Sequence, residues 1–235
     1  MELGSAGVAR LATGAEMRVT GPTGHAAVVC VNGGQGGEVE GTWSASLEWL
    51  VHRLAPDFPE LGFAEVKYRI KSWKRMDWCV ADAIAAVDET GAPRTLLLGF
   101  SMGGAVAIQA AAEPTVEAVL GLAPWIPERL GLETLRGKRF DVIHGSLDRW
   151  LPGIPGVSTA SSRRGYQRAR ALGVEGDYAL IPGALHGIAL RAGHDRLVPL
   201  PRAGAWARHV ATELERFRTR RAEDAAGRPD RRPAP

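Results

Sequence analysis

The chain is poor in cysteine, which limits how its fold can be held together. Among 235 residues only Cys30 and Cys79 carry a thiol. Cys30 falls in an apolar, strand-like run and Cys79 in a helix-like segment, so we expect two buried thiols and no disulfide. A small secreted fold stapled by several disulfides is excluded.

Long hydrophobic runs are also missing. No uninterrupted apolar stretch approaches the ~20 residues that a membrane-spanning helix needs. The first residues, Met1-Glu2-Leu3-Gly4-Ser5, contain no basic segment leading into an apolar one, which is how a signal peptide begins. We therefore expect a cytoplasmic protein that has no membrane partner.

An excess of charge of one sign is absent as well. The chain has 29 Lys and Arg against 26 Asp and Glu, a net charge of +3, and two of these net positive charges fall in residues 219–235. The nearly neutral remainder gives no basis for a nucleic-acid partner. The arginines and prolines of residues 219–235 predict a disordered basic tail, which leaves residues 1–218 as one domain.

Apart from an opening hairpin within residues 1–24, short β-rich runs alternate with helix-like segments. The β-rich runs are residues 26–31, 63–70, 95–98, 116–122, 140–144 and 178–181, and the helix-like segments are residues 43–54, 76–89, 105–112, 161–172 and 202–217. This alternation predicts an α/β fold with a mostly parallel central sheet and helices on both faces. Functional groups of such sheets gather in loops at the carboxyl ends of the strands.

One of these loops has the sequence Gly99-Phe100-Ser101-Met102-Gly103-Gly104. It follows the apolar run 95–98 and precedes the Ala-rich run 105–112, so Ser101 lies where a strand reverses sharply into a helix. The glycines at 99 and 103 leave room for that reversal. A bare Gly-x-Ser-x-Gly is a weak signal in a chain with 29 glycines. With a strand before it and a helix after it, the pattern predicts a nucleophile elbow in which Ser101 is the nucleophile.

A serine nucleophile needs a base, and the base needs a group that orients it. Asp148 lies in the loop after the run 140–144, and His186 lies in the loop after the run 178–181. This chain order of serine, acid and histidine is the order that accompanies a nucleophile elbow. We predict that His186 is the general base and then the general acid, and that Asp148 fixes its tautomer and stabilises the imidazolium.

Four further residues compete for these roles or flank them. His194 is a second candidate base, although no strand end leads into it, and Glu128 is a fallback acid one strand earlier. Asp141 lies inside a predicted strand, where it is expected to be a paired interior acid. His144 ends the same strand and is expected to be structural, orienting the turn that carries Asp148.

An oxyanion that develops in acyl transfer needs hydrogen-bond donors already in place. We predict the backbone N–H of Met102, directly after the nucleophile, and that of Gly34, in the glycine-rich loop after the run 26–31. The alternatives for this loop are a simple chain reversal or a nucleotide-phosphate site. It has neither Gly-x-Gly-x-x-Gly nor a Walker lysine, which weighs against the phosphate.

Taken together, these stretches resemble the α/β-hydrolase superfamily over residues 8–218, in particular its small, cap-less, serine-dependent members near the dienelactone hydrolase and carboxylesterase group. The stretches that carry the resemblance are Gly99-Phe100-Ser101-Met102-Gly103-Gly104, Leu122-Ala123-Pro124-Trp125, His144-Gly145-Ser146-Leu147-Asp148 and Pro182-Gly183-Ala184-Leu185-His186-Gly187. Two features depart from the family. The predicted oxyanion loop begins with Asn32-Gly33 where the family usually has His-Gly, and residues 151–165 form an irregular Pro/Gly/Ser stretch.

The resemblance implies an α/β-hydrolase fold without a cap domain, and neither cofactor nor metal. Serine at the elbow implies acyl transfer to water, whereas aspartate would imply dehalogenase or epoxide hydrolase chemistry. Trp43, Trp125 and Trp150 are expected to line an open cleft, which favours a small uncharged carboxylic ester or thioester as substrate. The alternative is a binding or sensor protein of the same fold that holds a small ligand without turnover.

Overall fold

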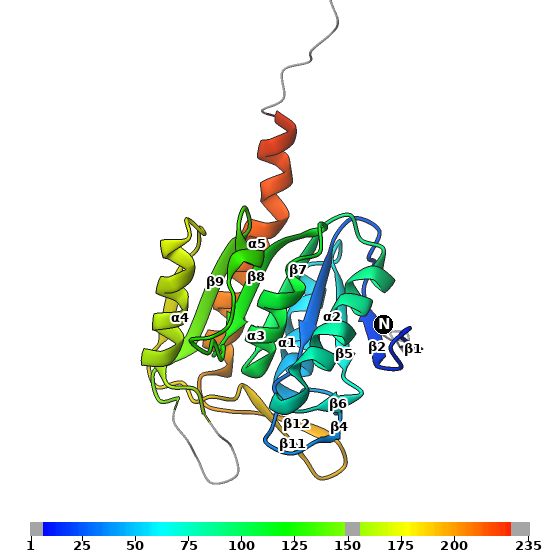
Figure 1. Cartoon of the computed structure of the whole chain (residues 1–235). Coiled ribbons are helices and arrows are strands. Elements are labelled where there is room, and N and C mark those ends of the chain that lie inside the picture. The colour runs from blue at the N-terminus through cyan, green and yellow to red at the C-terminus, as the bar shows by residue number, and fades with distance from the viewer. Residues whose placement is uncertain (1–6, 149–155, 227–235) are drawn as a thin grey trace, which may run out of the picture.

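A central sheet of eight strands organises the protein, whose computed structural model describes residues 7–148 and 156–226 (Figure 1). The spatial order is β1-β2-β5-β3-β7-β8-β9-β10. The strands are β1 (Val8–Arg10), β2 (Glu16–Thr20), β3 (Ala27–Val31), β5 (Gly62–Lys67), β7 (Thr95–Phe100), β8 (Val116–Leu122), β9 (Arg139–Gly145) and β10 (Tyr178–Ile181). Pairing is parallel from β5 to β10, and β2 joins β1 and β5 in antiparallel fashion. The predicted mostly parallel sheet is therefore confirmed.

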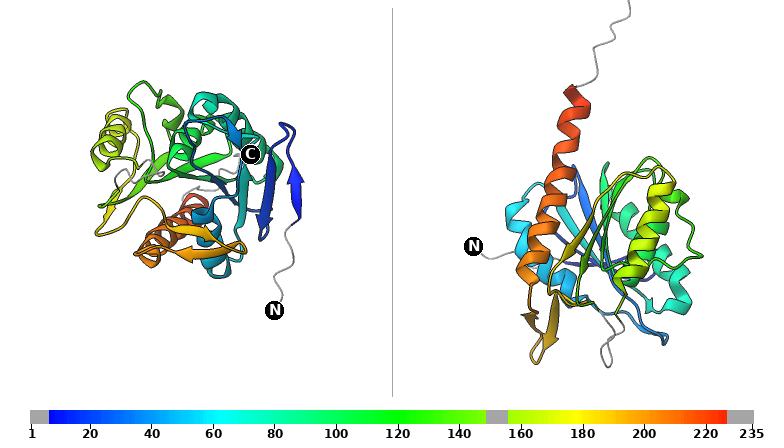
Figure 2. Two further views of the ribbon diagram at one scale, coloured as in Figure 1. Left: turned by 90° about the horizontal axis from the view of Figure 1, so that it is seen from below. Right: turned by 90° about the vertical axis from the view of Figure 1, so that its left-hand side faces the viewer.

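In the described ranges, five α-helices cover the two faces of this sheet. They are α1 (Ala45–Leu54), α2 (Met76–Thr90), α3 (Met102–Ala110), α4 (Thr159–Ala171) and α5 (Ala203–Ala226), and single 3-10 turns lie at η1 (Ala55–Asp57), η2 (Trp73–Arg75) and η3 (Glu133–Leu135). Helices α2, α3 and α4 lie on one face and α1 and α5 on the other (Figure 2). Each face has its own buried apolar cluster, which explains why the inner strands are apolar throughout.

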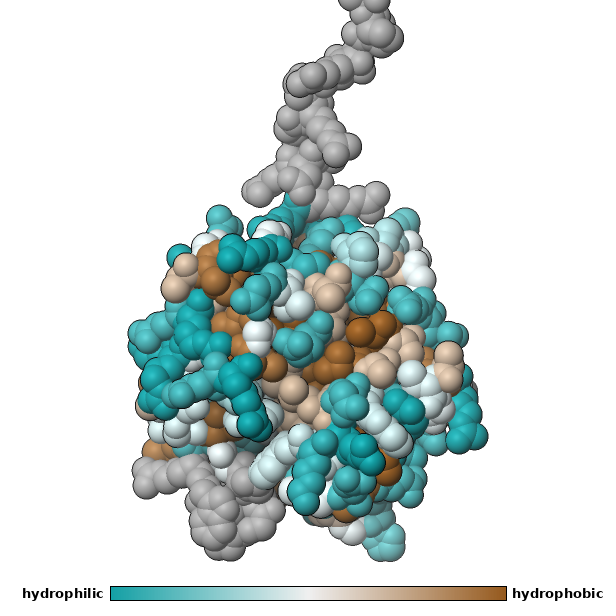
Figure 3. Space-filling view, in the orientation of Figure 1, coloured by the Kyte–Doolittle hydropathy of each residue, from teal (hydrophilic) through white to brown (hydrophobic). Residues whose placement is uncertain are grey.

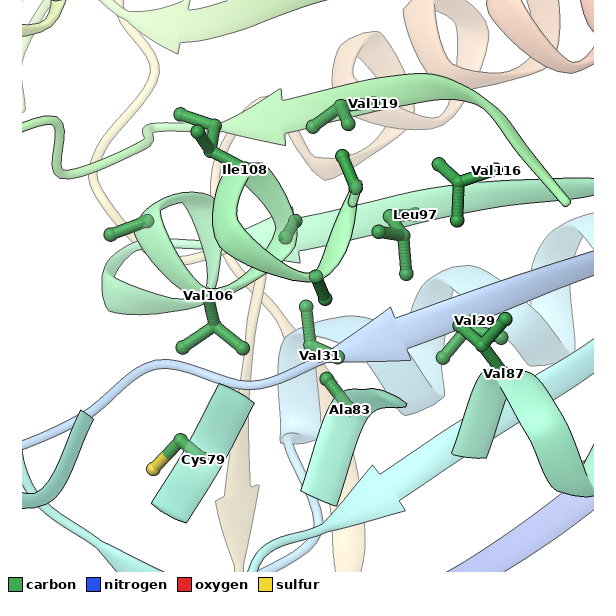
Figure 4. Packing of buried hydrophobic residues seen from close by; sticks show 14 of the residues in the cluster. Val29, Val31, Cys79, Ala83, Val87, Leu97, Val106, Ile108, Val116 and Val119 are labelled. Atoms are coloured by element: carbon green, nitrogen blue, oxygen red, sulfur yellow. The ribbon is translucent and has the colours of Figure 1, made fainter. Parts of the chain in front are cut away.

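Close packing ties α2 and α3 to the middle of the sheet. Ala83 and Val87 of α2 face Val29 and Val31 of β3 in the same buried cluster (Figure 4). The outer surface on this side is mostly polar around its outline, and the broadest group of hydrophobic residues forms a band across its middle (Figure 3). The close packing of this buried cluster fixes the position of α3, and therefore of the turn that precedes it.

Local sequence signals set the ends of several helices. The Ser44 hydroxyl accepts a hydrogen bond from the Leu47 N–H at the start of α1, and Ser158 caps α4 in the same way through the Ser161 N–H. Helix α2 ends at Gly91, whose φ of 58° suits glycine better than any other residue. Ser44 and Ser158 therefore mark where α1 and α4 begin, and Gly91 marks where α2 ends.

The structure differs from the sequence-based expectation at the C-terminal end of the chain. The predicted boundary at residue 218 falls inside α5, which continues to Ala226. Neither Gly nor Pro occurs between residues 205 and 226 to stop the helix, and the Thr219 hydroxyl donates to the Glu215 carbonyl. The predicted disorder of residues 219–226 is thus replaced by helix, while residues 227–235 lie outside the described part of the chain.

Two small antiparallel pairs were not predicted. They are β4 (Val39–Glu40) with β6 (Ile70–Lys71), and β11 (Ala189–Ala192) with β12 (Arg196–Pro199). Both lie at the lower end of the molecule in Figure 1. Between β8 and β9 the only regular element is η3, so this connection holds no cap domain. No helix in the described ranges is long and apolar enough to cross a membrane.

Candidate active site

The turn between β7 and α3 holds Ser101 in an unusual backbone conformation. Its φ is 56° and its ψ is −119°, a region that non-glycine residues rarely occupy. Three backbone hydrogen bonds fix it: the Ser101 N–H donates to Leu122 O at 2.9 Å, and Ser101 O accepts from the N–H groups of Gly104 and Trp125. Strain of this kind persists only where the surroundings determine the geometry, and it often marks a functional residue.

The two glycines of this turn are required by close backbone contact. A Cβ at Gly99 would lie 2.3 Å from Gly103 O, and a Cβ at Gly103 would lie 2.3 Å from Val31 O. A side chain at either position would push α3 away from the sheet. The Gly-x-Ser-x-Gly pattern therefore has a steric basis in this fold.

A hydrogen-bonded row of three side chains starts at this serine. His186 Nε2 lies 3.0 Å from Ser101 Oγ, and His186 Nδ1 lies 2.7 Å from Asp148 Oδ2. Ser101 follows β7, Asp148 follows β9 and His186 follows β10, so the row crosses the carboxyl edge of the sheet. The structure brings together all three residues that the sequence singled out for the nucleophile, acid and base.

Asp148 accepts two further hydrogen bonds besides the one from His186. The His144 Nε2 atom lies 2.9 Å from Asp148 Oδ2, and the Val157 N–H donates to Asp148 Oδ1 at 3.0 Å. Burial alone would raise the pKa of the Asp148 carboxyl, but the hydrogen bonds from His144 and His186 hold that pKa below its ordinary value. Asp148 is therefore a carboxylate over the working pH range.

The segment that carries His186 is attached to the first turn of α1. Ser46 Oγ accepts hydrogen bonds from the N–H groups of Ile188 and Ala189, at 3.0 and 3.3 Å. The Phe100 ring packs against the imidazole, with ring centroids 5.1 Å apart. These contacts fix the loop that places the histidine beside Ser101.

The glycine-rich loop after β3 is fastened by Asn32. Its side chain accepts from the Gly33 N–H at 2.7 Å and donates to Thr42 O at 2.9 Å, and its carbonyl accepts from the buried Tyr68 hydroxyl. Asn32 thus joins the two ends of the loop, which gives a role to the side chain that departs from the family pattern.

The same loop places Gly34 beside the start of α3. A Cβ at Gly34 would lie 2.2 Å from Met102 Sδ, so the two predicted oxyanion donors belong to adjacent segments. The Gly34 N–H donates to no acceptor of the described chain. The first N–H groups of a helix lack partners within it, and Met102 is the first residue of α3.

Two cavities flank this row of side chains. The larger, of about 340 Å³, is mostly apolar and is lined by Trp43, Phe100, His186, Leu190 and Leu200 among others. The smaller, of about 160 Å³, is lined by Trp73, Ser101, Trp125, Gly156 and Val157.

The predicted tryptophans are divided between these cavities. Trp43 lines the larger one, where the Arg18 guanidinium also covers its ring at 4.5 Å. Trp125 lines the smaller one and stacks on Trp73, with ring centroids 6.4 Å apart. Trp150 lies outside the described residues. Trp73 also lines the smaller cavity, and its 41% exposure places it at the surface of that cavity.

The competing candidates lie elsewhere. His194 is exposed in the turn between β11 and β12 and has no hydrogen bond to Ser101. Glu128 is exposed on the connection after β8. Asp141 is buried in β9 and paired with Arg139, as expected for an interior acid. Within the described chain, no three His, Cys, Asp or Glu side chains form a group that could hold a metal ion.

Comparison with known proteins gives a family and a fold. The profile described as "Alpha/beta hydrolase family" matches residues 28–231. No curated protein matches the chain in sequence.

Solved structures similar to this one span nearly its whole length. A dienelactone hydrolase from Anabaena variabilis ATCC 29413 is 17% identical with a TM-score of 0.62, covering 92% of this chain and 99% of that one. An alpha/beta hydrolase enzyme, MGS-M1, from a Medee basin deep-sea metagenome library is 14% identical with a TM-score of 0.65, covering 90% and 98%. The esterase Est2 of the planctomycete Thermogutta terrifontis, with propionate bound, is 16% identical with a TM-score of 0.60, covering 94% and 96%.

Proposed function

Because the chain belongs to the alpha/beta hydrolase family, we propose that it is a serine hydrolase that cleaves small uncharged carboxylic esters or thioesters through an acyl-enzyme. The observation that carries this proposal is the continuous row from Ser101 Oγ to His186 at 3.0 Å and from His186 to Asp148 at 2.7 Å. A serine hydroxyl becomes an effective nucleophile when a base within this distance removes its proton.

In the acylation step Ser101 is the nucleophile, and His186 is first the base and then the acid. His186 Nε2 accepts the hydroxyl proton while Ser101 Oγ bonds to the substrate carbonyl carbon, and the carbonyl electron pair moves onto oxygen. The N–H groups of Gly34 and Met102 hold that oxyanion. The proton then passes from His186 to the departing alcohol or thiol as its bond to the acyl carbon breaks.

Deacylation repeats these roles with water. His186 removes a proton from the water molecule as its oxygen bonds to the acyl carbon, and it returns that proton to Ser101 Oγ when the acid leaves. Asp148 stabilises the imidazolium in both steps, a role for which its low pKa is suited because a carboxylate must be ionised to act in this way.

The two cavities support a substrate of modest size. Their volumes of about 340 Å³ beside His186 and 160 Å³ beside Ser101 leave room for the acyl and the alcohol portions. Apolar walls favour uncharged groups, because a charge placed against them would lose its hydration. The propionate bound to Est2 of Thermogutta terrifontis is an acid of the size that we propose here.

The test is hydrolysis of a short activated ester such as p-nitrophenyl butyrate. We expect turnover by the wild-type protein and a loss in Ser101→Ala on the order of 10⁶ in kcat, because the variant has no nucleophile. Activity of the variant within about tenfold of wild type would contradict the assignment of Ser101. A wild-type protein that binds small esters without turnover would instead indicate the binding or sensor role.

A further inference from the structure

His144 occupies a place behind the proposed catalytic row that the reaction steps do not use. It ends β9, is fully buried and stacks on Tyr178 with ring centroids 6.4 Å apart. Its Nε2 atom lies 2.9 Å from Asp148 Oδ2 and 3.0 Å from Val157 O. Asp148 Oδ2 is thus shared by two imidazoles, His144 on one side and His186 on the other.

The surroundings of the His144 ring determine which of its nitrogens carries a proton. A carboxylate oxygen and a backbone carbonyl are both acceptors only, and both lie within hydrogen-bond distance of Nε2. An unprotonated Nε2 would face two lone pairs without a proton between them. Nδ1 is buried with no partner in the described chain, so a proton there would be left unsatisfied. The geometry therefore favours the neutral tautomer with hydrogen on Nε2.

A second contact joins His144 and Asp148 through one residue. The Val157 N–H donates to Asp148 Oδ1, and the Val157 carbonyl faces His144 Nε2. Both polar backbone groups of Val157 are therefore bound to this pair. Val157 also lines the smaller cavity together with Ser101, so the pair fixes part of the cavity wall as well as the carboxylate.

We propose that His144 is a positioning residue, which shares its Nε2 hydrogen between the Val157 carbonyl and Asp148 and so holds the carboxylate in line with His186. This proposal rests on the proposed function, because it assigns Asp148 the role of orienting the base. His144 adds a second contact on Asp148 Oδ2, and through the Val157 carbonyl it also holds the residue whose N–H donates to Oδ1. The same bond keeps the negative charge on Asp148 while His186 carries its proton.

The first test needs no substitution. In the wild-type protein, ring ¹⁵N NMR of the six histidines distinguishes protonated from unprotonated ring nitrogens. We expect His144 to have a protonated Nε2 and an unprotonated Nδ1 at neutral pH. An unprotonated Nε2 would overturn the proposal, and this result does not depend on whether any variant folds.

The second test compares variants that differ in one hydrogen-bond donor. His144→Phe keeps the flat ring without N–H, and we expect kcat to fall on the order of tenfold because a hydrogen bond to a charged group is lost, with KM nearly unchanged. His144→Gln supplies an amide donor at the position of Nε2 and should recover most of that loss. Tyr178→Phe is the control: it removes the hydroxyl that contacts Thr159 O and keeps the stacked ring.

The outcomes separate this proposal from the proposed function. A His144→Phe variant with kcat within about twofold of wild type, or a His144→Gln variant as slow as His144→Phe, overturns the positioning role. Tyr178→Phe as slow as His144→Phe does so too, because loosened packing alone would then explain the loss. If Ser101→Ala stays active, the proposed function fails instead.

Discussion

Single side chains at this site hold backbone segments in place as much as they face a substrate. Asn32 joins the ends of the glycine-rich loop, and Ser46 accepts two N–H groups of the segment that follows His186. Asn32 stands out in the sequence only as a departure from the family's His-Gly, and Ser46 does not stand out at all, because its partners are far along the chain. Only the fold brings Ser46 next to residues 188 and 189.

The choice between two histidines can be tested residue by residue. We expect His186→Ala to lose most ester turnover, because His186 is the base that contacts Ser101 Oγ. His194→Ala should stay near wild type, because His194 is exposed in a turn. Steady-state kcat on p-nitrophenyl butyrate measures both. The reverse ranking of the two variants would mean that the loop after β10 does not supply the base.

At the scale of elements, the β7–α3 turn was the most predictable part of the molecule. A continuous apolar run, a glycine-flanked serine and an Ala-rich segment each limit the local conformation, and together they leave few alternatives. The predicted end of α5 is wrong. The proline and arginine content of residues 219–235 is typical of disorder, but neither glycine nor proline interrupts the helix between residues 205 and 226. The β11–β12 pair was not predicted because each of its short, partly exposed strands carries an arginine and lacks a continuous apolar run.

The packing of α5 against the sheet predicts a pH-dependent stability. Burial and the nearby charge of Asp141 raise the pKa of Glu213 to about 7. Between its unfolded value of 4.5 and about 7 the native state binds more protons than the unfolded state, so the free energy of unfolding falls as pH rises through that window. Above about pH 7 Glu213 is ionised in both the native and the unfolded state, and its full destabilising effect is present.

Glu213→Gln should remove this dependence, since the amide cannot ionise. We expect urea unfolding at pH 8 to show the variant more stable than wild type by roughly 2 kcal/mol, with the difference nearly gone at pH 5. Glu215→Gln is the control, because Glu215 lies on the same helix with its side chain 48% exposed. A Glu213→Gln variant less stable than wild type at pH 8 would show that the Glu213 charge is favourable.

For the whole molecule, the sequence was sufficient for the fold and for the order of the proposed catalytic residues. The strands predicted from apolar runs end shortly before Ser101, Asp148 and His186. A parallel sheet places such strand ends along one edge. What could not be predicted depends on how side chains point once the chain is folded: the Trp73–Trp125 stack, the contact of the His144 imidazole with the Asp148 carboxylate and the hydrogen bonds of the Asn32 side chain. Helix α5 ends at the opposite side of the molecule from these loops (Figure 1).

The central claim is that Ser101 is an activated nucleophile, and covalent labelling tests it most directly. A fluorophosphonate phosphonylates a serine whose proton is removed by a neighbouring base, and fluoride leaves as Ser Oγ bonds to phosphorus. We expect one label per chain by intact mass, located on the peptide containing Ser101, and none on Ser101→Ala. A folded wild-type protein that remains unlabelled, or one labelled at a serine other than Ser101, would contradict the account.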